Sequence, residues 1–155
     1  MNLMRTIITV FLSAVPVAVI AIVLIPWMDS GVPFERDGRQ IALAPFWLAI
    51  IIAVVFICHV VSGVVAKSMD RSGNALYLLL GFELISRSIK FIAKLVISPR
   101  EVPDGLDLAT AEFRSAWPYL QIPPWYILAY GMLAIIGLYL GGVIAQRRAE
   151  MLTNA

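Results

Sequence analysis

The sequence predicts an all-α membrane protein with four transmembrane helices in an up-down bundle, forming a single domain over residues 1–155. Sixty-one per cent of the residues are hydrophobic, only 14% are charged, and the mean hydropathy is +0.88. A soluble domain of this size cannot bury so much apolar surface. Four segments have the roughly 20 apolar residues that cross hydrocarbon as a helix, and the four tryptophans fall near the predicted helix ends, as interfacial aromatic residues do.

The first helix is predicted over residues 6–25, which contain no charge. The preceding MNLMR also resembles the start of a secretory signal peptide. However, the apolar run is about twice the shortest signal core, and no small-x-small cleavage motif precedes Asp29. We therefore expect a retained membrane anchor.

The other three helices are predicted over residues 45–66, 75–97 and 125–146. Pro45 suits the first turn of a helix, Asn74 suits the cap of the next one, and Ser98-Pro99 should end it. Residues 26–44 and 98–124 then form loops on the outer side. Pro103-Asp104-Gly105 is typical of a turn, and the residues after Asp107 are expected to form a short interfacial helix.

Charges in the loops orient the predicted bundle. The side that holds both termini carries five cations against two acidic residues, whereas the opposite side carries four cations against seven. Cations concentrate on the cytoplasmic side of membrane proteins. The sequence thus predicts an integral protein of the bacterial inner membrane with both termini in the cytoplasm.

The third predicted helix carries an unusual set of charges in FELISRSIKFIAK, residues 82–94. At 100° per residue, Glu83, Arg87, Lys90 and Lys94 fall within about 60° of one another around the helix. They therefore form one polar face, named here the basic stripe. Lys90 and Lys94 lie close enough to the helix end to reach headgroups, whereas Glu83 and Arg87 lie deeper and have the spacing of an i,i+4 ion pair.

The second helix supplies a neighbour for the deeper pair. If helices two and three form a hairpin centred on Arg71, His59 and Glu83 reach the same depth, and Ser62 lies one turn from His59. We therefore predict an intramembrane polar cluster of His59, Ser62, Glu83 and Arg87. It is either a proton- or ion-responsive site or a structural clasp between helices.

Partner contacts are predicted at two places. The basic stripe holds more cations than acids, so Lys90 and Lys94 are expected to contact an external anion, from a lipid or another chain. Gly137 and Gly141, followed by Ala145, form a small-residue edge that permits close helix approach, either to another chain or within this one. The expected partners are membrane lipids and other membrane protein chains, with a hetero-complex favoured over a homo-oligomer.

Several classes of protein are disfavoured by the sequence. One histidine and one cysteine rule out a His-based zinc cluster and a multi-cysteine metal site within the chain, and glycine-rich phosphate loops and nucleophile motifs are absent. We expect no enzyme, cofactor or metal. A net charge of +2 without interleaved aromatic residues gives no sign of nucleic-acid binding.

The segment QIPPWYILAYGMLAIIGLYLGGVIAQRR, residues 121–148, resembles the last helix of the small membrane subunit of tripartite periplasmic transporters. The resemblance implies a four-helix subunit of a transport complex. The residues themselves favour a non-catalytic subunit or accessory factor of a larger membrane complex. The alternative is a small oligomeric proton- or ion-coupled transporter or channel that works through His59, Glu83 and Arg87.

Overall fold

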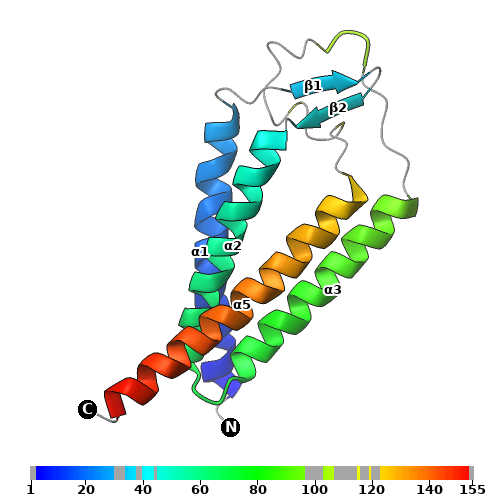
Figure 1. Cartoon of the computed structure of the whole chain (residues 1–155). Coiled ribbons are helices and arrows are strands. Elements are labelled where there is room, and N and C mark those ends of the chain that lie inside the picture. The colour runs from blue at the N-terminus through cyan, green and yellow to red at the C-terminus, as the bar shows by residue number, and fades with distance from the viewer. Residues whose placement is uncertain are drawn as a thin grey trace.

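The computed structural model describes residues 3–29, 34–37, 40–43, 45–96, 103–106, 115, 119 and 123–153, without the side chains of residues 20–44. Four long helices dominate this part of the chain (Figure 1). They are α1 (Leu3–Asp29), α2 (Pro45–Met69), α3 (Asn74–Val96) and α5 (Pro124–Thr153). Successive helices run in alternating directions, so both termini lie at the same end of the bundle.

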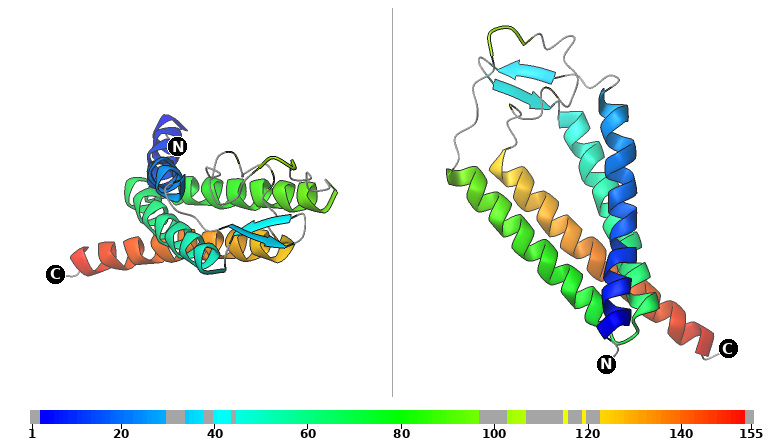
Figure 2. Two further views of the ribbon diagram at one scale, coloured as in Figure 1. Left: turned by 90° about the horizontal axis from the view of Figure 1, so that it is seen from above. Right: turned by 180° about the vertical axis from the view of Figure 1, so that it is seen from behind.

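The helices are arranged as two pairs. α1 lies beside α2, and α3 lies beside α5, while α2 and α5 cross each other over a long contact (Figures 1 and 2). The two pairs are close at the end that holds the termini and diverge toward the opposite end. The described apolar core consists of Ala66, Leu76 and Leu138, with Leu79 and Leu80 packed against it.

A short antiparallel hairpin lies in the first predicted outer loop, at the end away from the termini. It pairs β1 (Phe34–Asp37) with β2 (Gln40–Leu43), in a register that sets Phe34 opposite Leu43 and Asp37 opposite Gln40. The sequence predicted only a loop over residues 26–44. A glycine follows Asp37 in the sequence, and glycine is favoured in two-residue hairpin turns.

The helices agree with the predicted segments but are longer at most ends. The largest difference is at α5, which continues seven residues beyond 146 to Thr153. This extension is exposed and carries Arg147, Arg148 and Glu150, and Gln146 Nε2 donates to Glu150 Oε1 at 3.1 Å. The predicted turn after Pro103 is confirmed, because Leu106 N donates to the Pro103 carbonyl at 3.1 Å. The predicted interfacial helix in residues 98–124 lies almost entirely outside the described residues.

The tight connection between α2 and α3 is organised by Asp70. Its Oδ2 accepts a hydrogen bond from Ala75 N at 3.0 Å, in the first turn of α3, and one from Thr6 Oγ1 of α1 at 3.5 Å. The Ser72 hydroxyl donates to Oδ1 and lowers the pKa of Asp70, and the Ala75 amide lowers it further. Gly73, which follows Ser72, has a φ of 84°, a left-handed conformation that glycine adopts readily because it lacks a Cβ.

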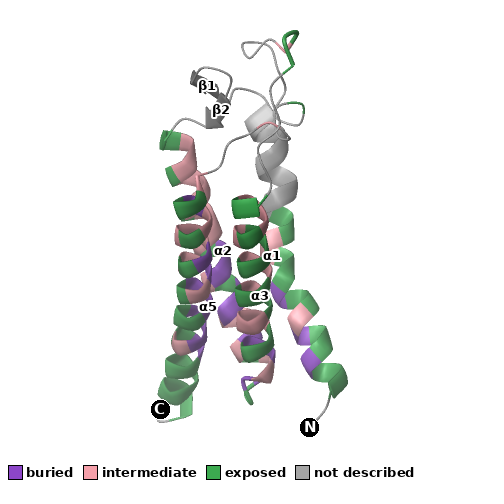
Figure 3. Ribbon diagram, turned by 90° about the vertical axis from the view of Figure 1, so that its right-hand side faces the viewer, coloured by how far each residue is buried: buried purple, intermediate pink, exposed green. Residues whose placement is uncertain are grey.

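Two helices of the described chain, α2 and α5, are long and apolar enough to cross a membrane. In α1, the stretch Leu3–Val19, whose side chains are described, is apolar but shorter than such a helix. Buried residues gather where the helices face one another, and exposed residues cover the outward faces (Figure 3). Those outward faces carry large apolar side chains on all four helices, including Phe11, Ile57, Phe82 and Tyr139.

Candidate functional site

The structure brings together three of the residues predicted to form an intramembrane cluster. Arg87 Nε donates to Glu83 Oε2 at 2.9 Å along α3, and His59 Nε2 of α2 lies 3.4 Å from Glu83 Oε1. Only 2% of the His59 side chain is exposed, against 15% for Glu83 and 18% for Arg87. We refer to His59, Glu83 and Arg87 as the polar cluster.

Helix α5 contributes a residue that the sequence analysis did not single out. The Arg87 guanidinium carbon lies 3.9 Å from the ring centroid of Tyr130. A cation over an aromatic face is attracted by the ring quadrupole, by about 0.5–2 kcal/mol depending on solvation. Arg87 thereby contacts Glu83 on its own helix and Tyr130 on α5. No local pattern in the sequence reveals this contact, because it depends on the rotation of α5 relative to α3.

Glycines on α5 make room for the polar cluster. A Cβ at Gly131 would lie 3.2 Å from Arg87 Cγ, so the stem of Arg87 packs directly on the α5 backbone. A Cβ at Gly137 would lie 3.1 Å from His59 Cβ and 3.0 Å from the Phe56 carbonyl oxygen. These positions let α5 approach α2 and α3 closely enough to pack against both His59 and Arg87.

The small-residue edge of α5 contacts α2 of the same chain. A Cβ at Gly141 would lie 2.1 Å from the Val60 carbonyl oxygen, and one at Gly63 would lie 2.2 Å from the Leu138 carbonyl oxygen. The sequence left open whether Gly137 and Gly141 contact another chain or the same one, and in the structure they pack against α2 of the same chain. Glycine on both facing helices permits this backbone contact, and the close approach occurs within the chain.

Ser62 is buried on α2 but takes no part in the polar cluster. Its Oγ has no hydrogen-bond partner among the residues that the structure describes, and neither does Thr9 Oγ1 of α1. Ser13 Oγ bonds instead to the Thr9 carbonyl at 2.7 Å within α1. The cluster in the structure therefore consists of His59, Glu83 and Arg87, without Ser62.

The outer part of the basic stripe is left without an acidic neighbour. Lys90 is exposed and Lys94 is half-buried, and neither forms an ion pair with any described residue. α3 thus carries three cations, Arg87, Lys90 and Lys94, and one carboxylate, Glu83, which pairs with Arg87. The stripe carries unmatched positive charge on a helix whose other faces are apolar.

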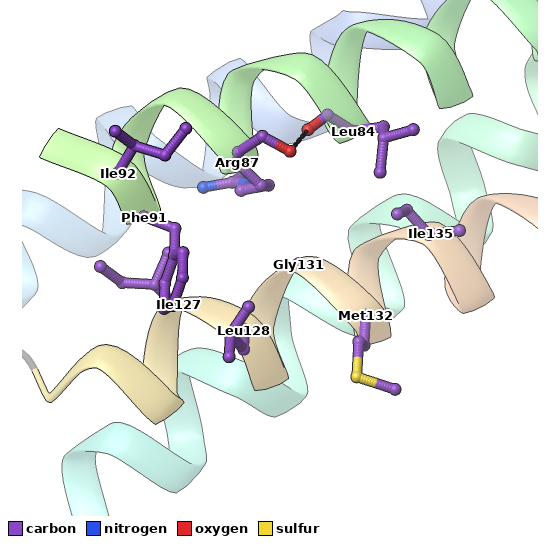
Figure 4. A pocket seen from close by; sticks show the side chains of 10 residues that line it. Leu84, Arg87, Phe91, Ile92, Ile127, Leu128, Gly131, Met132 and Ile135 are labelled. Atoms are coloured by element: carbon purple, nitrogen blue, oxygen red, sulfur yellow. Dashed lines mark hydrogen bonds between the residues drawn. The ribbon is translucent and has the colours of Figure 1, made fainter. Parts of the chain in front are cut away.

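An apolar groove of about 310 Å³ runs between α3 and α5 beside Arg87 (Figure 4). Its lining residues are Leu84, Arg87, Ser88, Phe91, Ile92, Ile127, Leu128, Gly131, Met132 and Ile135. Ser88 Oγ is occupied by a hydrogen bond to the Leu84 carbonyl at 2.8 Å. The groove therefore offers shape and apolar contact, with Arg87 as its charged side chain.

The polar cluster combines a carboxylate and an imidazole, two groups that can bind a proton, beside a guanidinium. Within the described residues, no three His, Cys, Asp or Glu side chains lie close enough to bind a metal ion. Cys58, next to His59, donates a hydrogen bond from its thiol to the Val54 carbonyl.

Comparison with known proteins adds no relative: no family, no curated protein and no solved structure matches the chain. The resemblance of residues 121–148 to a transporter subunit thus rests on those residues alone.

Proposed function

We propose that the chain is a non-catalytic integral membrane subunit or accessory factor of a larger membrane complex, and that its basic stripe contacts an acidic group of a partner chain. The observation that carries this proposal is the unmatched charge of α3. Lys90 is exposed, and the described residues offer it no carboxylate. The helix that could cover the stripe, α2, belongs to the pair that diverges from α3 toward its outer end.

Four membrane spans with both termini in the cytoplasm of a bacterial cell are part of the proposal. At 1.5 Å per residue, the 23 residues of α3 extend about 34 Å, enough to cross a hydrocarbon core of roughly 30 Å. Its outward face is covered by exposed apolar side chains such as Phe82, Ile85 and Ile89. Trp47 and Trp125, in the first turns of α2 and α5, lie at the end away from the termini, where an aromatic belt would form.

The charge of Lys90 has no counter-charge among the described residues. A lysine near the centre of a membrane helix costs about 2.5–3.5 kcal/mol on insertion scales. Lys94 lies two residues from the end of α3, and Lys90 lies about one turn further in, about 9 Å from Val96; both can reach headgroups. An acidic side chain on a neighbouring transmembrane helix would neutralise Lys90 and fix the orientation of the partner.

Native purification in mild detergent with charge-changing variants tests this proposal. We expect a stoichiometric membrane partner with the wild type and with Arg147→Gln, a control on the exposed extension of α5. Lys90→Glu should reduce recovery of the partner at least tenfold, and a complementary acid-to-lysine change in the partner should restore it. Equal recovery with Lys90→Glu and Arg147→Gln would refute a role for the stripe.

The second candidate is a small oligomeric proton- or ion-coupled transporter or channel that works through His59, Glu83 and Arg87. It is supported by the buried contact between the only histidine and a carboxylate. Purified protein in liposomes would then show pH-dependent flux that Glu83→Gln abolishes. A third possibility, the small membrane subunit of a tripartite periplasmic transporter, is one form of the first proposal and is supported by residues 121–148 only.

A further inference from the structure

The hydrogen bonding of His59 determines where the protons of its ring must lie. Nδ1 lies 2.7 Å from the carbonyl oxygen of Val55, one turn earlier in α2. A carbonyl oxygen only accepts hydrogen bonds, so Nδ1 must carry a proton and donate it. In the neutral ring, Nε2 is then a bare acceptor.

This bare nitrogen faces another acceptor. Nε2 is buried without a hydrogen-bond partner, and Oε1 of Glu83 lies 3.4 Å away. The other oxygen of the carboxylate, Oε2, is occupied by Arg87 Nε. Two acceptor atoms therefore lie 3.4 Å apart in a largely buried site, with no hydrogen bond between them. One added proton would allow a hydrogen bond to form between them.

We propose that the polar cluster is a proton-binding site that holds a single exchangeable proton between Nε2 of His59 and Oε1 of Glu83. The proton comes from water and returns to it, without redox chemistry or covalent change. Loading converts either the imidazole to imidazolium or the carboxylate to a carboxylic acid. In both cases the charge of His59, Glu83 and Arg87 together rises from zero to +1.

The surroundings of the site limit what else can supply this proton. On α3, Arg87 remains bound to Glu83, and on α5 the ring of Tyr130 lies against the Arg87 guanidinium. The Cys58 thiol of α2 donates a hydrogen bond to the Val54 carbonyl of the same helix. Among the described side chains of α1, the buried polar residues are Thr6, Thr9 and Ser13, which carry no charge.

The bound proton also connects the two helix pairs. His59 belongs to the α1–α2 pair and Glu83 to the α3–α5 pair, so the hydrogen bond joins one pair to the other. Loss of the proton leaves two acceptors facing each other at this junction. Proton occupancy is therefore expected to strengthen the contact between α2 and α3. This inference does not depend on a partner chain or on transport activity.

The presence of a single histidine makes the test direct. Protein labelled with ¹⁵N-histidine and reconstituted in lipid nanodiscs gives one pair of ring nitrogen signals, which report both tautomer and protonation. We expect the neutral ring to carry its proton on Nδ1, and the Nε2 signal to shift as the pH is lowered and the site loads. A neutral ring protonated on Nε2 would overturn the proposal, and this measurement on the wild type requires no variant.

A variant pair then identifies the partner of Nε2. In Glu83→Gln the carboxylate that favours the proton is lost, and the amide can itself donate to Nε2. We expect the proton affinity of the site to fall at least tenfold, a shift of one pH unit or more. The control Glu150→Gln, on the exposed end of α5, should leave the titration unchanged. An unchanged midpoint in Glu83→Gln would show that Glu83 does not share the proton.

Discussion

Replacing Gly141 with alanine tests the contact on which the bundle depends. The new Cβ would lie 2.1 Å from the Val60 carbonyl oxygen and 2.8 Å from Val64 N, whereas ordinary contact begins at 3.4 Å. Both neighbours are backbone atoms, so relief requires α2 and α5 to separate by more than 1 Å. Overpacking of this kind costs about 1–3 kcal/mol. We therefore expect a clear loss of stability.

Gly81→Ala is the matched control for this change. Gly81 lies within α3, and a Cβ there would meet nothing within 4 Å. Alanine should be neutral or stabilising by about 0.5–1 kcal/mol, because it lowers the entropy cost of forming the helix. Thermal unfolding in one detergent, followed by loss of the monodisperse size-exclusion peak, compares the variants. If Gly141→Ala is as stable as Gly81→Ala but loses an oligomer, the edge contacts another chain and the intramolecular packing is refuted.

Two further predictions concern Asp70, in the turn between α2 and α3, and the contact between Arg87 and Tyr130. Asp70→Ala should cost about 0.5–2 kcal/mol near neutral pH, as helix caps do. Because the pKa of Asp70 is lowered in the folded state, its contribution to the free energy of unfolding is complete above about pH 4 and is lost as the pH falls through the lowered value. The unfolding midpoints of wild type and variant should therefore converge in acid. A constant difference down to pH 2 would contradict this. Tyr130→Leu should cost about 0.5–2 kcal/mol through the lost contact with Arg87. In the double variant with Arg87→Met the cost of Tyr130→Leu should largely vanish, and additive effects in the same unfolding assay would show that the ring and the guanidinium do not interact.

The contact between His59 and Glu83 was predictable because helical depth follows from residue counts. Both residues lie twelve positions from Arg71, and an antiparallel hairpin brings such positions to the same level. The i,i+4 spacing likewise predicted the ion pair between Glu83 and Arg87. Both contacts are present, at 3.4 Å and 2.9 Å. Helix periodicity and chain reversal were sufficient to predict this part of the site.

Contacts with α5 were harder to anticipate, because a long connection, residues 97–123, separates it from α3. Its rotation about its own axis decides whether Tyr130 faces Arg87 and whether Gly141 faces α2 or lipid. A helix with apolar residues on all sides gives little periodic signal for that rotation. The sequence therefore located the small-residue edge correctly but left open whether another chain or the same chain occupies it.

The contacts of the turn between α2 and α3 with the start of α1 were also not predicted, for a different reason. Asp70 and Arg5 are polar residues in loop or terminal positions, where solvation is the ordinary expectation. In the structure Arg5 donates to the Met69 carbonyl at 3.0 and 2.6 Å, and Asp70 is buried. These contacts join the start of α1 to the end of α2, across 64 positions of sequence. Local sequence patterns do not carry such information.

Site-specific photocrosslinking in native membranes tests the proposed role of the basic stripe most directly. A photoreactive residue at position 90 lies on the stripe, and one at position 85 lies on the opposite, exposed apolar face of α3. We predict that position 90 crosslinks to a defined transmembrane segment of a second protein that carries an Asp or Glu, and that position 85 does not. Crosslinks from position 90 to lipid alone would contradict a partner subunit at the stripe.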